Sequence, residues 1–250
     1  MSRVHILMYH RVGDFPHRMP SHRAQYCHLP RFRAQMQMLR RTGHTVLSLD
    51  QVLAGLRGEV TLPPRAVALT FDDAYVDFLE CAVPVLQEFD YPATVYAVAG
   101  LLGGQNDWVV PEGLTPAPLM SAAQLREVQA LGFTVGSHTV SHPRLAQCDT
   151  PRIRQELVDS KHILEDVLGC PVNHFCYPYG SHDLRAVEAA AEAGYHTATT
   201  CLRTSATPAD DPLSLPRKAV SQGNTALRVW WNMLTQNTPR SAPIRRPTCR

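Results

Sequence analysis

Two adjacent carboxylates, Asp72 and Asp73, directly follow the apolar run 66–71. A single acid at the end of a buried strand can cap the next helix, but two in a row call for solvent, a cation or two chemical tasks. Taken alone, a helix cap at Asp73 beside an exposed Asp72 explains the pair about as well as an active site does. The choice depends on which other side chains the fold brings to the same place.

Two histidines, His138 and His142, follow a second β-type run. Their spacing of four brings both imidazoles to one side of a helical turn or a tight loop. Most pairs of this kind are structural. With an acid from another strand end, however, they form a two-histidine, one-carboxylate set that binds a divalent metal and leaves positions open for water and substrate. One aspartate then holds the metal, and its neighbour takes a proton from the water that the metal activates.

The segment 175–180, Phe-Cys-Tyr-Pro-Tyr-Gly, is the third candidate. Its proline and glycine favour a tight turn that can direct the backbone N–H of Tyr179 at an oxyanion. Taken alone, these residues favour an ordinary aromatic turn. For substrate binding we expect Tyr177 of this turn and Trp108, which lies in the Gly- and Pro-rich stretch 100–118. Loop packing is the alternative role for Trp108.

Short β-type runs alternate with helix-type patterns along most of the chain, and no linker divides them. Strands are expected at 4–9, 45–47, 66–71, 94–98, 133–136, 175–177, 196–199 and 213–215, and helices at 30–42, after Ser48, and at 76–89, 121–130, 151–168, 184–193 and 225–234. This alternation predicts an α/β fold, a distorted (β/α) barrel of about seven parallel strands, with its site at the C-terminal strand ends. We expect one domain over 1–238 and a disordered, basic tail over 239–250.

Bulk composition excludes several classes of protein. The 250 residues are 44% apolar and 18% charged, which is typical of a globular chain, and the net charge of +2 predicts no nucleic-acid partner. Seven cysteines without a CxxC pair argue against a disulfide framework or a zinc ribbon. No apolar stretch approaches membrane-spanning length, and the N-terminal apolar run is too short for a signal peptide, so we expect a cytoplasmic protein. Oligomeric state cannot be predicted from these features.

Three motifs together resemble those of a known family. Thr-Phe-Asp-Asp at 70–73, His-Thr-Val-Ser-His at 138–142 and Pro-Tyr-Gly at 178–180 are similar, in order and spacing, to the motifs of polysaccharide deacetylases of carbohydrate esterase family 4, the NodB-homology domain. The resemblance extends from about Val4 to Arg217. It implies a distorted (β/α) barrel and metal-dependent removal of an N-acyl group from an amino sugar.

The resemblance also assigns roles to residues. It implies that Asp72 is the base and that Asp73, His138 and His142 bind a divalent metal, with Zn²⁺ expected and Co²⁺, Ni²⁺ or Mn²⁺ also compatible. It implies that Tyr179 supplies an oxyanion N–H.

The expected acid departs from the common family pattern. A late Leu-x-His motif usually supplies it, but this chain has Leu-Pro-Arg at 215–217. The segment Met-Tyr-His-Arg at 8–11 is similar to a permuted branch of the family in which that motif lies at the front. We therefore assign His10 as the acid, with a structural histidine in the barrel mouth as the alternative.

The arginine that often begins the third motif is also missing, and Cys176 stands in its place. We expect Arg217 to replace it and to hold Asp72 ionised.

These features predict an enzyme that removes an acetyl group from an amino sugar, either in a glycan or in a lipid- or nucleotide-linked precursor for surface polysaccharide or O-antigen. A deformylase or a hydrolase of small cyclic amides on the same fold is an alternative. A non-catalytic carbohydrate-binding domain is another, although binding alone would not require the base Asp72.

Overall fold

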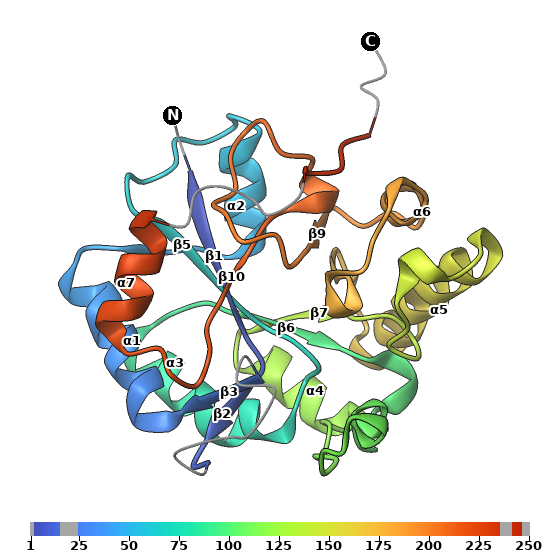
Figure 1. The fold of residues 1–250 in the computed structure, drawn as a ribbon, viewed down its shortest axis with the longest axis horizontal. Helices are drawn as coiled ribbons and strands as arrows, with labels where there is room; N and C mark the ends of the chain where they lie inside the picture. Colours follow the sequence, from blue (N-terminus) through green and yellow to red (C-terminus); the bar gives the residue numbers. More distant parts are fainter. Residues whose placement is uncertain (1–2, 16–24, 236–241, 247–250) are drawn as a thin grey trace.

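A curled parallel sheet runs through the middle of the protein, and helices surround it (Figure 1). The computed structural model describes residues 3–15, 25–235 and 242–246. In the main sheet the strand order is β10-β1-β5-β6-β7-β8-β9, with β4 also paired to β5 and all pairings parallel. Its strands are β1 Val4–Tyr9, β4 Thr45–Val46, β5 Ala66–Phe71, β6 Thr94–Ala97, β7 Thr134–Ser137, β8 His174–Cys176, β9 Thr197–Thr199 and β10 Lys218–Ala219. The predicted distorted barrel of about seven parallel strands is confirmed.

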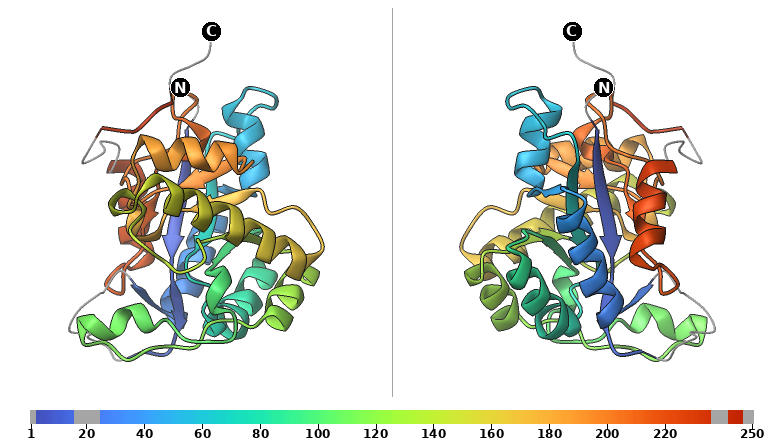
Figure 2. Two further views of the ribbon diagram at one scale, coloured as in Figure 1. Left: turned by 90° about the vertical axis from the view of Figure 1, so that its right-hand side faces the viewer. Right: turned by 90° about the vertical axis from the view of Figure 1, so that its left-hand side faces the viewer.

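Helices cover the outside of this sheet (Figures 1 and 2). They are α1 Leu29–Arg41, α2 Leu49–Leu56, α3 Val83–Phe89, α4 Ala122–Ala130, α5 Thr150–Leu168, α6 Leu184–Glu192 and α7 Ala226–Thr235. Ser48 and Ser121 open α2 and α4 with capping boxes, in which serine and glutamine satisfy each other's backbone N–H groups. These helices lie where the apolar periodicity of the sequence predicted them.

Two expected elements are interrupted in the structure. The helix predicted over 76–89, in which Pro84 allows a kink or a split, is divided into a π-helical turn, Phe78–Ala82, and α3, with Pro84 in the first turn of α3. Of the predicted strand 213–215, the first two residues lie in a 3-10 turn, Pro212–Ser214, and Leu215 forms an isolated parallel bridge with Thr199. Asp211 accepts a hydrogen bond from the N–H of Leu213 (2.9 Å), and Pro212 has no N–H to offer a ladder, so the chain turns here.

A small second sheet was not predicted from the sequence. Strand β2, Arg11–Gly13, pairs in parallel with β3, Tyr26–His28. Each strand has three residues, too few to produce an alternating pattern.

Strand register brings the site residues together. In β1 and β5, Tyr9 is paired with Phe71, and the N–H of Asp72 donates to the carbonyl of Tyr9 (2.9 Å). His10 and Asp72 therefore leave the sheet side by side. The pairing of β6 with β7 brings the loop beyond Ser137 to the same edge, since neighbouring parallel strands end together.

Within the predicted tail 239–250, the structure describes residues 242–246, and disorder of the tail stays a prediction. Arg246 pairs with both carboxylate oxygens of Asp211 (2.8 and 2.9 Å), and Ile244 packs against the core. The rest of the tail lies outside the described residues.

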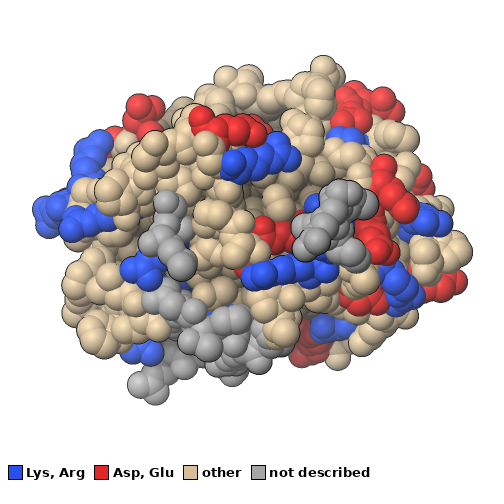
Figure 3. Space-filling model, turned by 90° about the horizontal axis from the view of Figure 1, so that it is seen from above, with Lys and Arg blue, Asp and Glu red and all other residues tan. Residues whose placement is uncertain are grey.

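The end of the barrel where β1 begins carries acidic and basic side chains interspersed among uncharged ones (Figure 3). Among the residues that the structure describes, no helix combines the length and the apolar character needed to cross a bilayer.

Candidate active site

Asp73, His138 and His142 converge at the C-terminal edge of the sheet. One oxygen of Asp73, Oδ1, lies 3.3 Å from Nε2 of His138 and 3.4 Å from Nε2 of His142. All three side chains are buried, and their candidate ligand atoms lie within 4.8 Å of one another. The structure thus brings together the three side chains expected to hold a metal.

The histidines reach this position because the segment 138–142 is a tight loop and not a helical turn. Thr139 (φ 69°) and His142 (φ 60°) both adopt left-handed backbone conformations, which are strained for residues other than glycine. The hydroxyl of Thr139 accepts the N–H of His142 (3.0 Å). This local closure directs both imidazoles at Asp73.

The donor set fits a divalent cation. Within the described part of the chain, Oδ1 of Asp73 is buried without a hydrogen bond of normal geometry, which leaves it open to a ligand. Nδ1 of His138 donates to the carbonyl of Cys176 (2.7 Å), so its Nε2 is the nitrogen that faces Asp73. Burial opposes protonation of His138, but Cys176 and Asp73 outweigh it and raise its pKa, so a cation would displace a proton from this ring. Burial lowers the pKa of His142, which favours its neutral, ligating form. One carboxylate and two imidazoles suit Zn²⁺ and its neighbours among the transition metals.

Asp72 is held by a buried arginine. Arg217 donates from both terminal nitrogens to the two oxygens of Asp72 (2.6 and 2.8 Å). The same guanidinium donates to the carbonyl of Thr200 (2.9 Å) and the hydroxyl of Thr70 (3.1 Å), and it contacts Sγ of Cys176 (3.1 Å). Burial opposes ionisation of Asp72, but Arg217 outweighs it, and the pKa of Asp72 lies below its ordinary value.

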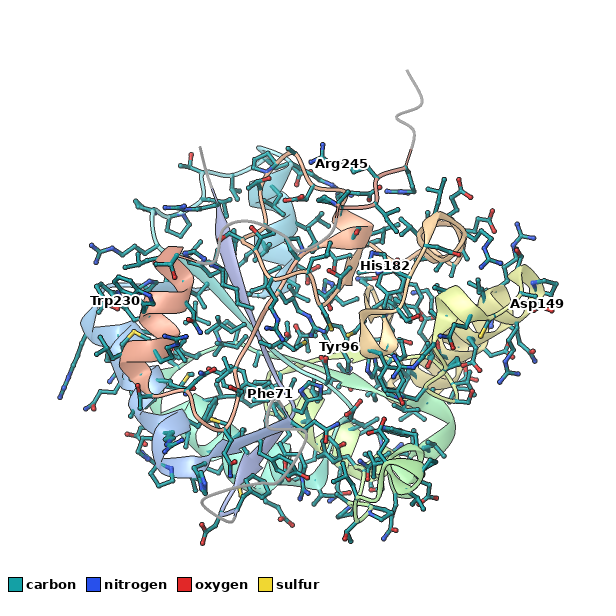
Figure 4. All side chains as sticks on the ribbon, in the orientation of Figure 1. Phe71, Tyr96, Asp149, His182, Trp230 and Arg245 are labelled. Carbon is teal, nitrogen blue, oxygen red and sulfur yellow. The ribbon has the colours of Figure 1, made fainter. Side chains whose placement is uncertain are left out.

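Tyr96 forms the floor beneath these groups, near the centre of the molecule (Figure 4). The Arg217 guanidinium carbon lies 5.8 Å from its ring centre, and the His138 ring lies 6.4 Å from it. The Arg217 guanidinium and the His138 ring therefore both lie near this buried aromatic ring.

The structure places His10 beside Asp72. Its Nε2 lies 3.8 Å from Oδ2 of Asp72, and 17% of its side chain is exposed. Its Nδ1 is buried and has no partner among the described residues. A group that is partly open to the mouth and close to the base is placed to exchange a proton with a substrate, but its role as acid remains a prediction.

The predicted turn is present as a 3-10 turn, Pro178–Gly180, in which Tyr179 has a φ of 59° and Gly180 a φ of 64°. The Tyr179 ring lies 4.6 Å from that of His142, and the guanidinium of Arg144 lies 3.8 Å from its centre on the outer side. Tyr179 therefore borders the metal group, and the use of its N–H for an oxyanion remains a prediction.

Trp108 and Tyr177, the two residues expected to contact the substrate, lie in different surroundings. Trp108 stacks on His142, with ring centres 4.1 Å apart and planes at 21°, so one face of the indole is used within the protein. The prediction for Tyr177 was wrong, because its side chain is fully buried and its hydroxyl donates to the carbonyl of Leu213 (2.8 Å). Side chains alternate along a strand, and Cys176 rather than Tyr177 faces the site.

Two supports of the site were not predicted from the sequence. Burial and the charge of Asp73 raise the pKa of Tyr75, whose hydroxyl accepts a bond from the amide nitrogen of Asn106 (2.7 Å). The side-chain oxygen of Asn106 accepts the N–H of Ala117 (2.6 Å), so the long loop is linked to a tyrosine near a candidate metal ligand. Glu156 of α5 bonds the loop 138–142. Neither residue belongs to a recognisable motif, although Tyr75 lies only two positions beyond Asp73.

Fold and site together define a parallel (β/α) barrel with a candidate metal group and an acid–base group at its strand ends. The family model for polysaccharide deacetylases matches residues 59–198, more than half of the chain, so the protein belongs to the polysaccharide deacetylase family.

Individual relatives agree with this assignment. YxkH of Bacillus subtilis is 24% identical over 224 residues, 89% of this chain and 73% of YxkH. The poly-beta-1,6-N-acetyl-D-glucosamine N-deacetylase of Escherichia coli K12 is 27% identical over 194 residues, 65% of this chain but only 29% of that larger protein. Among solved structures, the Streptococcus pyogenes deacetylase PplD in complex with acetate superposes with a TM-score of 0.78 and 27% identity, over 93% of this chain and 98% of PplD.

Proposed function

We propose that this protein is a metal-dependent hydrolase that removes the acetyl group from N-acetylated amino sugars in a glycan. The observation that carries the proposal is the arrangement of Asp72. It is an ionised carboxylate clamped by Arg217, adjacent in sequence to Asp73 of the candidate metal group. A binding domain would need the metal ligands but not a second, separately oriented acid.

Asp73, His138 and His142 would hold the cation. When bound, a divalent cation supplies Lewis-acid chemistry that polarises the acyl carbonyl and acidifies water. Asp72 takes up the proton of the attacking water. The two bonds from Arg217 hold the Asp72 carboxylate in one orientation during the reaction. The N–H of Tyr179 stabilises the oxyanion as the carbonyl carbon becomes tetrahedral. His10, on the neighbouring strand end, donates the proton that the departing amine requires.

The names of relatives guide the choice of substrate. The Escherichia coli relative is a deacetylase of poly-beta-1,6-N-acetyl-D-glucosamine. We therefore propose oligomers of N-acetylglucosamine as the first class to test, with β-1,6 linkage ahead of β-1,4. The cytoplasmic location, a lipid or nucleotide carrier and a part in O-antigen or surface polysaccharide synthesis stay predictions.

The direct test is acetate release from β-1,6- and β-1,4-linked N-acetylglucosamine oligomers. Protein treated with a chelator and then reloaded with Zn²⁺ or Co²⁺ is compared with the untreated and chelated forms. Asp72→Asn and His10→Ala accompany the wild type. Release that requires metal and is lost in both variants would support the whole scheme.

Other outcomes separate its parts. Loss in Asp72→Asn alone would keep the deacetylase and remove His10 as the acid. Activity that survives complete metal removal would refute metal dependence. Metal binding without acetate release would refute this substrate class and direct the search to formyl or cyclic-amide substrates.

A further inference from the structure

Glu156 of α5 is a buried carboxylate, and its hydrogen bonds and ion pair join it to the loop between His138 and His142 and to Arg152 of the same helix. Oε2 of Glu156 accepts the backbone N–H groups of Val140 (2.7 Å) and Ser141 (2.9 Å). Its Oε1 accepts the hydroxyl of Ser141 (2.5 Å) and pairs with Arg152 (2.6 Å). Only 1% of the Glu156 side chain is exposed.

The contacts of Glu156 fall at the centre of the strained loop. Val140 and Ser141 lie between Thr139 and His142, whose left-handed conformations are strained for residues that carry a side chain. Without an external anchor, a loop with two such residues would relax toward ordinary backbone angles and carry His142 away from Asp73. The backbone N–H groups that Glu156 accepts are fixed in direction by those same angles, so the bonds form only in the strained conformation.

We infer that Glu156 is a positioning residue for the metal group: it holds the loop 138–142 in the one conformation that directs both imidazoles at Asp73. The inference rests on the proposed function only in that these side chains bind a divalent metal. It requires nothing of the substrate. Residues outside the ligand set that orient ligands commonly change metal affinity by about 10–100-fold when removed.

A purely structural role makes a different prediction. If Glu156 served only to attach α5 to the barrel, its loss would lower stability and leave metal affinity alone in the folded fraction. Glu165 offers the comparison on the same helix, since it accepts the N–H of Val172 (2.9 Å) and pairs with Lys161 (2.8 Å) but does not touch the histidine loop.

The experiment measures the Kd for Zn²⁺ and Co²⁺ by competition with a chromophoric chelator. It uses the full chain as wild type, Glu156→Gln, Glu156→Ala and Glu165→Gln. Amide hydrogen exchange of Val140 and Ser141 in the metal-free protein supplies a second readout. We expect Kd to rise about 10-fold in Glu156→Gln and about 100-fold in Glu156→Ala, with faster exchange at both amides, while Glu165→Gln keeps the wild-type values.

The inference is overturned if folded Glu156→Gln and Glu156→Ala bind metal like the wild type, if Glu165→Gln weakens binding equally, or if the wild type binds neither metal. Should the Glu156 variants fail to fold, Ser141→Ala removes the hydroxyl's bonds to Glu156 and Arg152 and leaves the two backbone N–H bonds to Glu156. A Kd raised several-fold in Ser141→Ala then supports the role, and an unchanged Kd rejects it. Wild-type protein that binds metal but releases no acetate defeats the proposed function and leaves the positioning role standing.

Discussion

Replacement of Arg217 by methionine tests the link between the buried ion pair and catalysis. The substitution keeps much of the side-chain volume and removes both bonds to Asp72. It leaves a carboxylate that is 3% exposed and has lost its counter-ion. Breaking a buried pair in this way costs about 3–5 kcal/mol, because the remaining charge is desolvated without compensation.

The double variant Asp72→Asn, Arg217→Met should cost no more than the worse of the two single variants, since neither buried charge then remains. Independent residues would instead give the sum of the single costs, about 6–10 kcal/mol. Urea unfolding of the metal-free protein at pH 7 gives the four free energies of unfolding. Arg246→Met is the control, because its bidentate partner Asp211 lies in a more exposed pair, and we expect a cost under about 1 kcal/mol.

The pH dependence supplies a second check with a definite sign. In the wild type the pKa of Asp72 is lowered, so its pairing stabilises the fold above the unfolded-state pKa and is lost as pH falls through the folded-state pKa. Without Arg217, burial is opposed only by the weaker effects of His10 and His138, so the pKa of Asp72 should rise. The stability gap between wild type and Arg217→Met should therefore be widest near neutral pH and narrow under acid. The acidic limb of the activity profile should move to higher pH. Additive free energies within about 0.5 kcal/mol, or an unmoved acidic limb, would refute the coupling.

Three further predictions concern the rim of the site. His10→Ala should lower kcat on N-acetyl sugars about 100-fold or more. It should lower kcat on an aryl acetate far less, because a phenolate leaves without help from an acid. Equal losses of kcat on both substrates would contradict the role of His10 as the acid. Trp108→Ala removes the stack on His142 and should raise the metal Kd measured by chelator competition, whereas a sugar-platform role alone would change only KM. Gly180→Ala should lower Tm by several degrees in thermal unfolding. The φ of Gly180 is +64°, and a Cβ at this position would lie 2.7 Å from the Cβ of Cys201. An unchanged Tm would show that the turn relaxes freely.

Sequence patterns predicted the barrel because its strands and helices are long enough to show their periods. Strand β1 has six residues and ends directly at His10, so the edge that carries the site could be located from the pattern alone. Strands β2 and β3 have three residues each and carry no usable period. The segment 213–215 is buried like a strand and has a leucine on either side of a serine, but the preceding proline and Asp211 turn it.

Part of the chemistry of the site could also be predicted from sequence patterns. Motifs gave the residues that face the mouth, and a missing arginine indicated Arg217 as its replacement, a pairing that the structure displays. Tyr177 was misassigned because a residue beside a motif residue points to the opposite face of its strand. Glu156 could not be found, because with Arg152 four residues earlier it looks like an ordinary surface ion pair of a helix. Its burial depends on a loop that only the tertiary fold brings over it.

The pairing of β1 with β10 has a consequence for synthesis of the chain on the ribosome. Asp72 precedes Arg217 by 145 residues, and the segment matched by the family model, 59–198, ends before the arginine appears. A nascent chain that has reached residue 200 contains every candidate metal ligand but no counter-ion for Asp72. Burial of that carboxylate is unfavourable until Arg217 emerges, so the segment that carries Arg217 controls when the barrel interior can close. Chains that stop short of Arg217 should accordingly remain open at this seam and be recognised by chaperones or proteases.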